Sequence, residues 1–467
     1  MLNDYQSSTQ GGYAEGWNYL EYGAKTYLPF MAAYHRWAGG ETLPYYGVPT
    51  IQIESPHANK VDLIADFAVN ERTRAVFERA LWSVQPDGLM PNTDDANPAP
   101  LPGGLLAWMF DEPTFLWQWF KPAVSFHSWG LDTASFALHD GTLPPDEPGE
   151  PLEGSFQDAG FAIFRDSWGP DATYLVLQGE HGTVREHGEG HEHADELSFL
   201  LWAHGRPLLI DPGYIDWDHH DMVRYASDHN TILVDGKGSP VSDVFKQFVG
   251  VDAFLSKMVS EGSITWVEVQ TKYQGVSFVR RLVRVDKAAF VIEDRMDGGG
   301  MVHTYSLLLN GMGGGDVPDS LFKILNDGGR WNNAPATVDA HILPVSGPWP
   351  ASISHDLQEH ATGHGVWAMH ERLVADAVMD DPAGFLSAIL TSSGADETPE
   401  TSSGQYGPGT AWVSWASGEK CFHVVSNQTN ADVGAVEQNG PFPPGLTIGI
   451  FEHGCKTPGD LIEVHHL

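Results

Sequence analysis

The spacing of hydrophobic residues along the chain changes near residue 150. Before that point, large side chains recur every three to five residues between residues 16 and 37, which predicts a helix. A second helix is predicted over residues 70–84, because Asn70 is a good N-cap residue and the turn at 86–88 ends the pattern. The segment 105–120 is rich in tryptophan, and most of these indoles are expected in a core, with sugar stacking as the alternative. The N-terminal third is therefore predicted to be helical.

Short β-type runs follow one another from residue 156 to the C-terminus. They alternate apolar and polar residues and are bounded by glycine, proline and aspartate. No helical pattern intervenes, so we predict antiparallel sheets packed as a sandwich. The chain then divides into a helical domain over residues 1–140, a linker over 141–155 and a β domain over 156–467. The β domain can include a distinct C-terminal subdomain from about residue 380.

The composition indicates a folded and strongly acidic protein. The chain has 467 residues, too many for one ordinary core, and 42% of them are hydrophobic. Its 25 basic and 62 acidic residues give a net charge of −37, which argues against nucleic-acid binding, since phosphate contacts need clustered lysine and arginine. No apolar run is long enough to span a membrane, and the first residues lack the basic and apolar regions of a signal peptide.

The chain has two cysteines, Cys421 and Cys455, both near the C-terminus. This number excludes a disulfide-rich scaffold and a metal site built from thiolates. A single disulfide and two free thiols are equally compatible with the sequence.

Histidines crowd into one part of the β region. Eight of the 22 lie within residues 181–235. His191 and His193 are two residues apart, so on a strand both would face the same side. Asp211 follows one apolar run and His229 precedes another, which makes His193, Asp211 and His229 a plausible Zn²⁺ set with an open fourth position. The alternative is a polar seam in which these side chains only hydrogen-bond.

The same stretch resembles a known family. The runs GHEHADELSF, GRPLLIDPGY and DHNTILVDG resemble the signature of the heparinase II/III-like polysaccharide lyases, which include heparin lyases and alginate and oligoalginate lyases. Residues 12–19 (GYAEGWNY) resemble that family's helix-opening motif, residues 85–91 a later helix-hairpin turn, and residues 156–168 the first strand of its β domain. The resemblance covers about residues 10–310. It implies an α+β multidomain fold, a partial N-terminal (α/α) toroid followed by a large antiparallel β-sandwich.

The resemblance also implies a reaction, β-elimination at a uronic acid. A base takes the C5 proton, the substrate carboxylate is neutralised, and an acid protonates the departing O4. Tyr19 is the candidate for the base, the acid or both, and as a base it needs positive neighbours that favour its phenolate. His191 matches the histidine that faces the substrate near the carboxylate. A second catalytic tyrosine is Tyr214 or Tyr225, and Tyr225 is favoured because Arg224 lies beside it.

Further residues are assigned to the metal and the substrate. By resemblance, the metal positions of the family are occupied here by His193, Asp211 and His229. Zinc is the usual metal at these positions, where it organises the β domain beside the active site. The candidates for substrate binding are Glu15, Tyr22, Tyr214, Trp217 and Arg224.

One feature departs from the family pattern. Relatives carry an Asn or His that helps to neutralise the carboxylate well upstream of the Glu-Gly…Tyr motif, whereas 18 residues precede Tyr19 here. Either the chain is a fragment of a longer enzyme, or another group such as His35 or Arg36 takes that role.

Three functions are therefore open. A lyase acting on uronate-containing glycans is favoured, with alginate-like substrates preferred because 25 basic residues are few for heavily sulfated heparin. The alternatives are a binding protein of the same fold without catalysis, and a zinc hydrolase. The expected partner is an anionic polysaccharide or oligosaccharide, and a homo-oligomer is compatible with the sequence. Family analogy places the protein in the periplasm or outside the cell.

Overall fold

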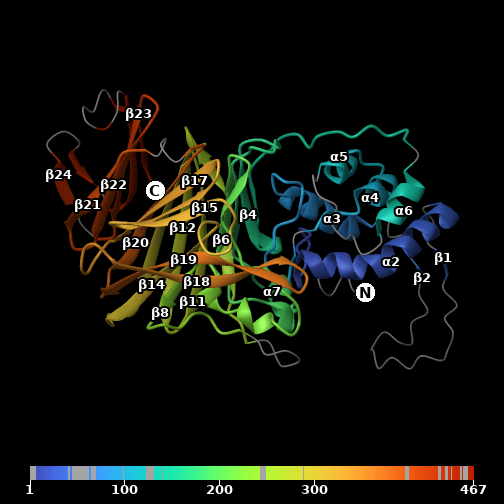
Figure 1. The fold of residues 1–467 in the computed structure, drawn as a ribbon, viewed down its shortest axis with the longest axis horizontal. Coiled ribbons are helices and arrows are strands. Elements are labelled where there is room, and N and C mark those ends of the chain that lie inside the picture. Colours follow the sequence, from blue (N-terminus) through green and yellow to red (C-terminus); the bar gives the residue numbers. More distant parts are fainter. Residues whose placement is uncertain are drawn as a thin grey trace.

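A computed structural model describes most of the chain. The described residues are 7–39, 43–44, 63–64, 70–97, 99–121, 131–139, 141–241, 249–287, 289–394, 399–429, 433–436, 440–442, 444–452, 455 and 461–467. In this part of the chain, helices cover one face of a two-sheet sandwich and a smaller sheet covers the other face (Figure 1).

The helices lie in the N-terminal third. The predicted first helix is α2 (Gly16–Ala38), and the second is α3 (Glu71–Ser83), where the Asn70 side chain accepts a hydrogen bond from the Thr73 N–H at 3.0 Å. The tryptophan-rich segment forms α4 (Gly103–Phe110) and α5 (Thr114–Phe120), and it is followed by α6 (Leu131–Leu138). Both predicted helices are confirmed, while a toroid stays a prediction. Within the described residues, no helix combines the length and apolar character needed to cross a membrane.

Two antiparallel sheets form the sandwich, as predicted. The first contains β3 (Gly154–Phe156), β4 (Phe161–Arg165), β5 (Tyr174–Gln178), β6 (Phe199–Ala203), β7 (Arg206–Leu209), β8 (Ile232–Val234), β14 (His303–Gly311), β18 (Ser352–Gly363) and β19 (Val366–Met379). The second contains β9 (Ala253–Leu255), β10 (Val259–Glu261), β11 (Ile264–Tyr273), β12 (Val276–Asp286), β13 (Ala289–Asp297), β15 (Ser320–Leu325), β16 (Gly328–Asn333), β17 (Ala336–Pro344) and β20 (Ala383–Ser392). Most of these strands are joined by short turns to a neighbour in the same sheet, which is why their signals follow one another so regularly.

Strand β4 shows how the layers are held together. Ala162 and Phe164 pack into the core between the two large sheets, where the Phe164 ring meets Phe290 at a centroid distance of 6.0 Å. Phe161 and Ile163 point to the other face and pack against the helices. A strand that is buried on both faces joins the helical layer to the sandwich, so the two cannot separate without exposing a continuous apolar surface.

The C-terminal sheet forms the last layer. It contains β21 (Thr401–Gly407), β22 (Thr410–Ser417), β23 (Lys420–Asn427), β26 (Gly445–Glu452) and β27 (Leu461–His466). It starts at Thr401 rather than near residue 380, because β20 pairs with both β13 and β17 of the larger sheet. Two short pairs lie outside the large sheets: β1 (Leu43–Pro44) with β2 (Leu63–Ile64), and β24 (Val433–Val436) with β25 (Gly440–Phe442).

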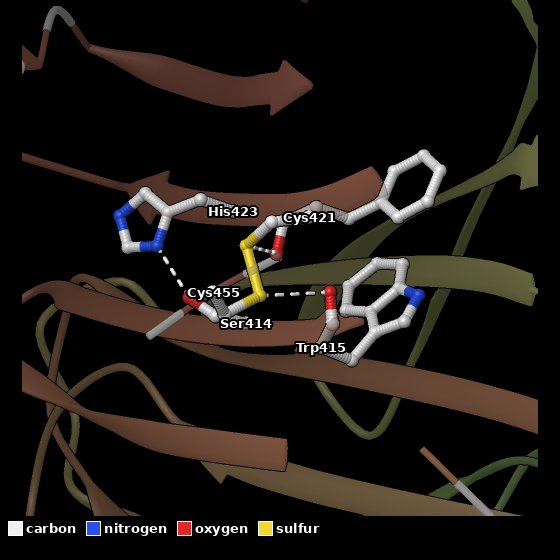
Figure 2. Close-up of a disulfide and its surroundings, with 6 residues drawn as sticks. Ser414, Trp415, Cys421, His423 and Cys455 are labelled. Atoms are coloured by element: carbon white, nitrogen blue, oxygen red, sulfur yellow. Dashed lines mark hydrogen bonds between the residues drawn. A yellow bond between two sulfur atoms is a disulfide. The ribbon is translucent and has the colours of Figure 1, made fainter. Parts of the chain in front are cut away.

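The two cysteines are joined in this C-terminal layer. Cys421 on β23 forms a disulfide with Cys455, and the Cys455 sulfur lies 3.0 Å from the carbonyl oxygen of Trp415 on β22 (Figure 2). The choice that the sequence left open is therefore resolved as a disulfide.

Short helical turns occur where the β domain meets the helices. They are η2 (Gln157–Ala159), α7 (Thr183–Glu186), η3 (Glu189–His191), η4 (His220–Met222) and η5 (Ala226–Asp228). The last four belong to the histidine-rich stretch, so this stretch is largely loop and not strand.

Candidate functional site

Asp95 lies at the centre of a group of imidazoles between the helices and the β domain. Its Oδ2 accepts a hydrogen bond from His191 Nδ1 at 2.7 Å, and its Oδ1 lies 3.0 Å from His193 Nε2 and 2.7 Å from His220 Nε2. Burial by itself would raise the pKa of Asp95, but these three contacts hold that pKa well below its ordinary value. Asp95 is therefore a fixed negative charge that orients three histidines.

The loop that carries Asp95 is held directly against the β domain. The Asn92 side chain donates to the carbonyl oxygen of Asp211 at 2.9 Å, and the Tyr214 N–H donates to the carbonyl oxygen of Ala96 at 3.0 Å. Gly213 has φ of 66°, and a Cβ at that position would meet Asn92 Nδ2 at 2.8 Å. Gly213, two residues after Asp211, therefore lets the two segments approach closely.

His191 and His193 converge for a different reason from the predicted one. They lie at the end of η3 and in the loop after it, so the expectation that a strand directs both to one face is wrong. The two oxygens of Asp95 bring them together instead. Asp95 and His220 were not singled out from the sequence, since Asp95 lies in a loop without periodicity and His220 is one of eight histidines in a short stretch.

Tyr19 faces this group from the first turn of α2. Its ring lies 4.1 Å from the His191 ring, centroid to centroid, and its hydroxyl oxygen is 3.3 Å from that of Tyr214. Burial raises the pKa of Tyr19; the Tyr214 hydroxyl opposes this rise, and the charges of Asp95 and Glu15 add to it. An imidazole of the kind expected from the sequence, His191, does lie beside Tyr19, but burial has the larger effect on the pKa of Tyr19, so Tyr19 keeps its proton at neutral pH.

Tyr214, and not Tyr225, is the second tyrosine in contact with Tyr19. Burial and the neighbouring Tyr19 raise the pKa of Tyr214 well above its ordinary value. Tyr225 is 43% exposed, and its backbone N–H donates to the Asp228 side chain at 3.0 Å at the start of η5. The preference for Tyr225 over Tyr214 therefore has no support in the geometry.

Arg224 does not lie at the surface as a substrate ligand would. Its side chain is 3% exposed, and its Nη1 lies 3.4 Å from His220 Nδ1. Arg224 is therefore reassigned from direct substrate binding to a buried position in which it contacts the His220 imidazole.

Exposed aromatic side chains border the group. Trp217 is 44% exposed and its ring stacks on His220 at a centroid distance of 5.8 Å. Tyr22 is 46% exposed, meets the Tyr19 ring edge-on at 6.1 Å, and carries the Lys25 ammonium 3.4 Å from its ring centroid. Glu15 is the N-cap residue that precedes α2, so it does not share a helix face with Tyr19 as predicted. Indole and phenol faces at this border suit the apolar faces of sugars.

The tip of the β18–β19 hairpin completes the border and was also missed in the sequence. The Gly365 N–H donates to the carbonyl oxygen of Ile215 at 2.8 Å, and the His364 ring lies 6.3 Å from the Tyr214 ring. This hairpin reaches from the sandwich toward α2 (Figure 1). The site thus combines residues from one helix, one loop and three parts of the β domain.

Residues 149–411 match the family profile described as heparinase II/III-like, C-terminal. The chain belongs to the heparinase II/III-like family. A curated relative, the heparin-sulfate lyase of Bacteroides stercoris, is 26% identical over 166 residues, which are 34% of this chain and 22% of the relative. The resemblance inferred from the histidine-rich motifs is confirmed.

Solved structures show the same fold. Heparinase III superposes with a TM-score of 0.66 at 16% identity, over 91% of this chain and 61% of that protein. The heparan sulfate lyase from Pedobacter heparinus gives a TM-score of 0.63 at 14% identity, over 88% of this chain and 58% of that protein. This heparinase II/III-like chain thus spans about three fifths of the length of these solved relatives.

The metal positions expected for the heparinase II/III-like family form a buried cluster. Ligand atoms of His193, Asp211 and His229 lie within 4.8 Å of one another, and all three side chains are fully buried. His193 Nδ1 and His229 Nε2 are buried without a hydrogen-bond partner. Two imidazole nitrogens and a carboxylate at this spacing are a donor set that fits zinc.

The surroundings of this cluster also suit a metal. Asp95 bonds the Nε2 of His193, which leaves its Nδ1 for the cluster, and such carboxylate contacts orient metal-binding histidines. Burial lowers the pKa of His193 to about 4, so this imidazole is neutral at pH 7. Burial opposes protonation of His229 as well, but Asp211, 2.9 Å from its Nδ1, raises the pKa of His229 to about 9, so a metal that binds its Nε2 would displace a proton.

His35 and Arg36 do not replace the upstream residue of the family. Both lie in the last turn of α2, which places them ~24 Å along the helix from Tyr19, at 1.5 Å per residue. His35 packs against Trp108, with ring centroids 5.9 Å apart. Neither side chain can neutralise a carboxylate held beside Tyr19.

Proposed function

We propose that this chain carries the active site of a polysaccharide lyase that cleaves uronate-containing glycans by β-elimination. The observation that carries the proposal is the contact of Tyr19 with both His191 and Tyr214 beside the buried Asp95. Proton-transferring groups are thus held together at an exposed aromatic border. Elimination needs a base and an acid at one place and a group that neutralises the substrate carboxylate, and it needs no attacking nucleophile.

His191 and Tyr19 divide the two proton transfers. Asp95 accepts the Nδ1 hydrogen of His191, so Nε2 carries the lone pair and takes the C5 proton. The electron pair of the C5–H bond forms the C4–C5 double bond as the C4–O4 bond breaks. Tyr19, whose pKa is raised by burial, holds a proton at neutral pH and donates it to O4. Tyr214 supplies a hydroxyl that orients the Tyr19 hydroxyl.

An alginate-like polymer is the proposed substrate. The relatives reported above are named as lyases of heparin or heparan sulfate. Like alginate, these polymers contain the uronate on which elimination acts. This chain has 25 basic residues against 62 acidic ones, which disfavours dense sulfate binding. Tyr22 and Trp217 offer stacking surfaces that need no charge on the sugar.

We also propose that zinc occupies the cluster of His193, Asp211 and His229. The ion would stabilise the junction of the loops that carry His191 and Tyr214, and when bound it supplies a fixed positive charge beside them. The three ligand side chains are fully buried, so substrate does not reach them. This burial disfavours the zinc hydrolase, which requires an open metal position in contact with substrate.

An oxidising compartment is proposed as well. The Cys421–Cys455 disulfide is typical of periplasmic or extracellular proteins. Localisation in the periplasm or outside the cell predicts that protein isolated from the native cell contains no free thiol at these positions, which a thiol-specific reagent under denaturing conditions would measure.

The test is the rise in near-ultraviolet absorbance that an unsaturated uronate gives. We expect it with alginate, or its mannuronate or guluronate blocks, and not with hyaluronan, chondroitin, heparan sulfate or ulvan. Tyr19→Phe should lower the rate by about 10²–10⁴-fold. Tyr27→Phe is the matched control on the same helix, because the buried Tyr27 hydroxyl has no hydrogen-bond partner among the described residues.

Each outcome has a definite meaning. Full activity in Tyr19→Phe would remove this tyrosine from the mechanism, and turnover of heparan sulfate alone would overturn the alginate preference. Saturable binding of oligouronates without an absorbance change would favour a binding protein of the same fold without catalysis. That alternative is also motivated by length, because this chain spans about three fifths of the solved relatives.

A further inference from the structure

We propose a second cation site, for Ca²⁺, formed by the carboxylates of Asp94, Glu180 and Glu192. One oxygen from each residue lies within 4.8 Å of the others. The site shares no residue with the histidine cluster, and it offers oxygen ligands only. Calcium binding at this position can be measured whether or not the protein carries out the proposed elimination.

Asp94 provides the observation that points to a ligand. Its side chain is 4% exposed, and its Oδ1 is buried without a hydrogen-bond partner. A buried carboxylate oxygen without a partner is costly unless a proton or a cation binds it. Asp94 and Glu180 both line a cavity of about 20 Å³, next to Gly16 and Trp17. A cavity of that size holds one water molecule or one ion.

The excess of negative charge around the three carboxylates also favours a bound cation. Two more acidic side chains, Asp195 and Glu196, lie near Asp94, Glu180 and Glu192, and Arg185 is a cation that contacts this group. Arg185 bonds Glu192 at 2.6 Å and also bonds Glu196. Burial and the repulsion between carboxylates raise the pKa of Asp94 and of Glu180 well above the ordinary values. A dication removes this repulsion without requiring that the carboxyl groups take up protons.

The geometry favours Ca²⁺ over other metals. Carboxylate oxygens suit hard cations and not zinc, which prefers nitrogen and sulfur. One oxygen from each of the three carboxylates lies within 4.8 Å of the others, so a single Ca²⁺ with its flexible oxygen coordination can contact all three. Mg²⁺ keeps several waters, and the small cavity has no room for them.

The site joins the segments that build the candidate active site. Asp94 precedes Asp95, Glu192 lies between His191 and His193, and Gly16 begins the helix that carries Tyr19. A cation bound here would fix the loop, the helix and the β domain relative to one another. Its loss should loosen the contact between Tyr19 and the imidazoles.

The experiment measures Ca²⁺ binding to the full chain at constant zinc content. Elemental analysis after dialysis against micromolar CaCl₂ should find about one calcium per chain. CaCl₂ at a hundredfold excess over Kd should raise the midpoint of thermal unfolding by about 1–4 °C over EGTA-treated protein, and MgCl₂ at the same concentration should raise it much less. Tb³⁺ should show luminescence sensitised by Trp17, which lines the same cavity.

Variants make the result specific. Asp94→Asn should abolish calcium binding and the Ca²⁺-dependent shift, keep zinc, and be at least as stable as the wild type in EGTA, because the substitution relieves repulsion. Glu180→Gln provides a second variant with the same expectation. Asp356→Asn removes an exposed carboxylate on β18 that pairs with Arg372, and it should leave calcium binding unchanged.

Equal calcium content in the wild type and both cluster variants would overturn the proposal. So would a midpoint that does not respond to CaCl₂, which would mean that protons neutralise the cluster. An equal shift with MgCl₂ would overturn the assignment of the ion to Ca²⁺. None of these results depends on glycan turnover, so a protein without lyase activity can still be tested.

Discussion

Asp95 Oδ2 accepts a hydrogen bond from His191 Nδ1 at 2.7 Å, although the two residues are 96 positions apart in the chain. The contact joins a loop of the helical region to the histidine-rich stretch of the β domain. It fixes the tautomer of His191, because a carboxylate accepts the Nδ1 hydrogen and leaves Nε2 free to act as a base.

Asp95→Asn should therefore lower kcat by about 10²–10⁴-fold while the fold is kept. The amide can donate to Nδ1 and so favours the tautomer with the hydrogen on Nε2. Rates from the absorbance assay would be compared at saturating zinc, because His193 also contacts Asp95. Asp158→Asn, at an exposed aspartate that accepts a hydrogen bond from Thr9, is the control. A wild-type rate in Asp95→Asn would contradict the orienting role.

Tyr214→Phe should reduce turnover by about 10-fold or more, whereas Tyr225→Phe should change it by less than about 3-fold. The reason is that the Tyr214 hydroxyl lies 3.3 Å from that of Tyr19, while Tyr225 is 43% exposed. The two variants lose the same atom, so parallel kinetics compare them directly. The reverse order of effects would restore the assignment drawn from the sequence.

Protein purified without added metal should contain about one zinc per chain in addition to any calcium. His193→Ala should abolish the zinc and lower the midpoint of thermal unfolding, since metal binding stabilises the native state. His355→Ala, at an exposed histidine on β18, should retain the zinc. A wild-type protein that is fully folded and free of zinc would contradict the assignment of a zinc site.

Asp327 predicts a pH dependence of stability far from the site. It lies 2.8 Å from His341 Nδ1 and accepts a hydrogen bond from Ser403 at 2.7 Å, which ties the second large sheet to the C-terminal sheet. Burial would raise the pKa of Asp327, but these contacts outweigh burial and lower it. A lowered pKa in the folded state means that the stabilisation is present above the ordinary aspartate pKa and is lost as pH falls through the folded value.

Asp327→Asn should accordingly lower the free energy of unfolding by ~1–3 kcal/mol at pH 7, and by much less near pH 2–3. Urea unfolding at both pH values measures the difference. An equal loss at the two values would show that the charge of Asp327 is not responsible.

Much of the fold could be predicted from local patterns. The first helix, the cap at Asn70 and the succession of β-strands each arise from neighbours a few residues apart, which is the range over which helical and strand periodicity acts. The boundary of the C-terminal sheet was less accurate, because strand β20 looks the same whichever sheet it joins. Sheet membership depends on partners that are far away in the chain.

The sequence by itself determined the family, through the histidine motif, and it named Tyr19 and His191 together with the cluster of His193, Asp211 and His229. Only the tertiary structure selected Tyr214 over Tyr225, and only it placed Asp95 among the histidines. It also brought Asp94, Glu180 and Glu192 together. The physical reason is that these residues lie in loops, where no repeating pattern in the sequence indicates which way a side chain points. Their positions depend on the packing of the helices against the sandwich.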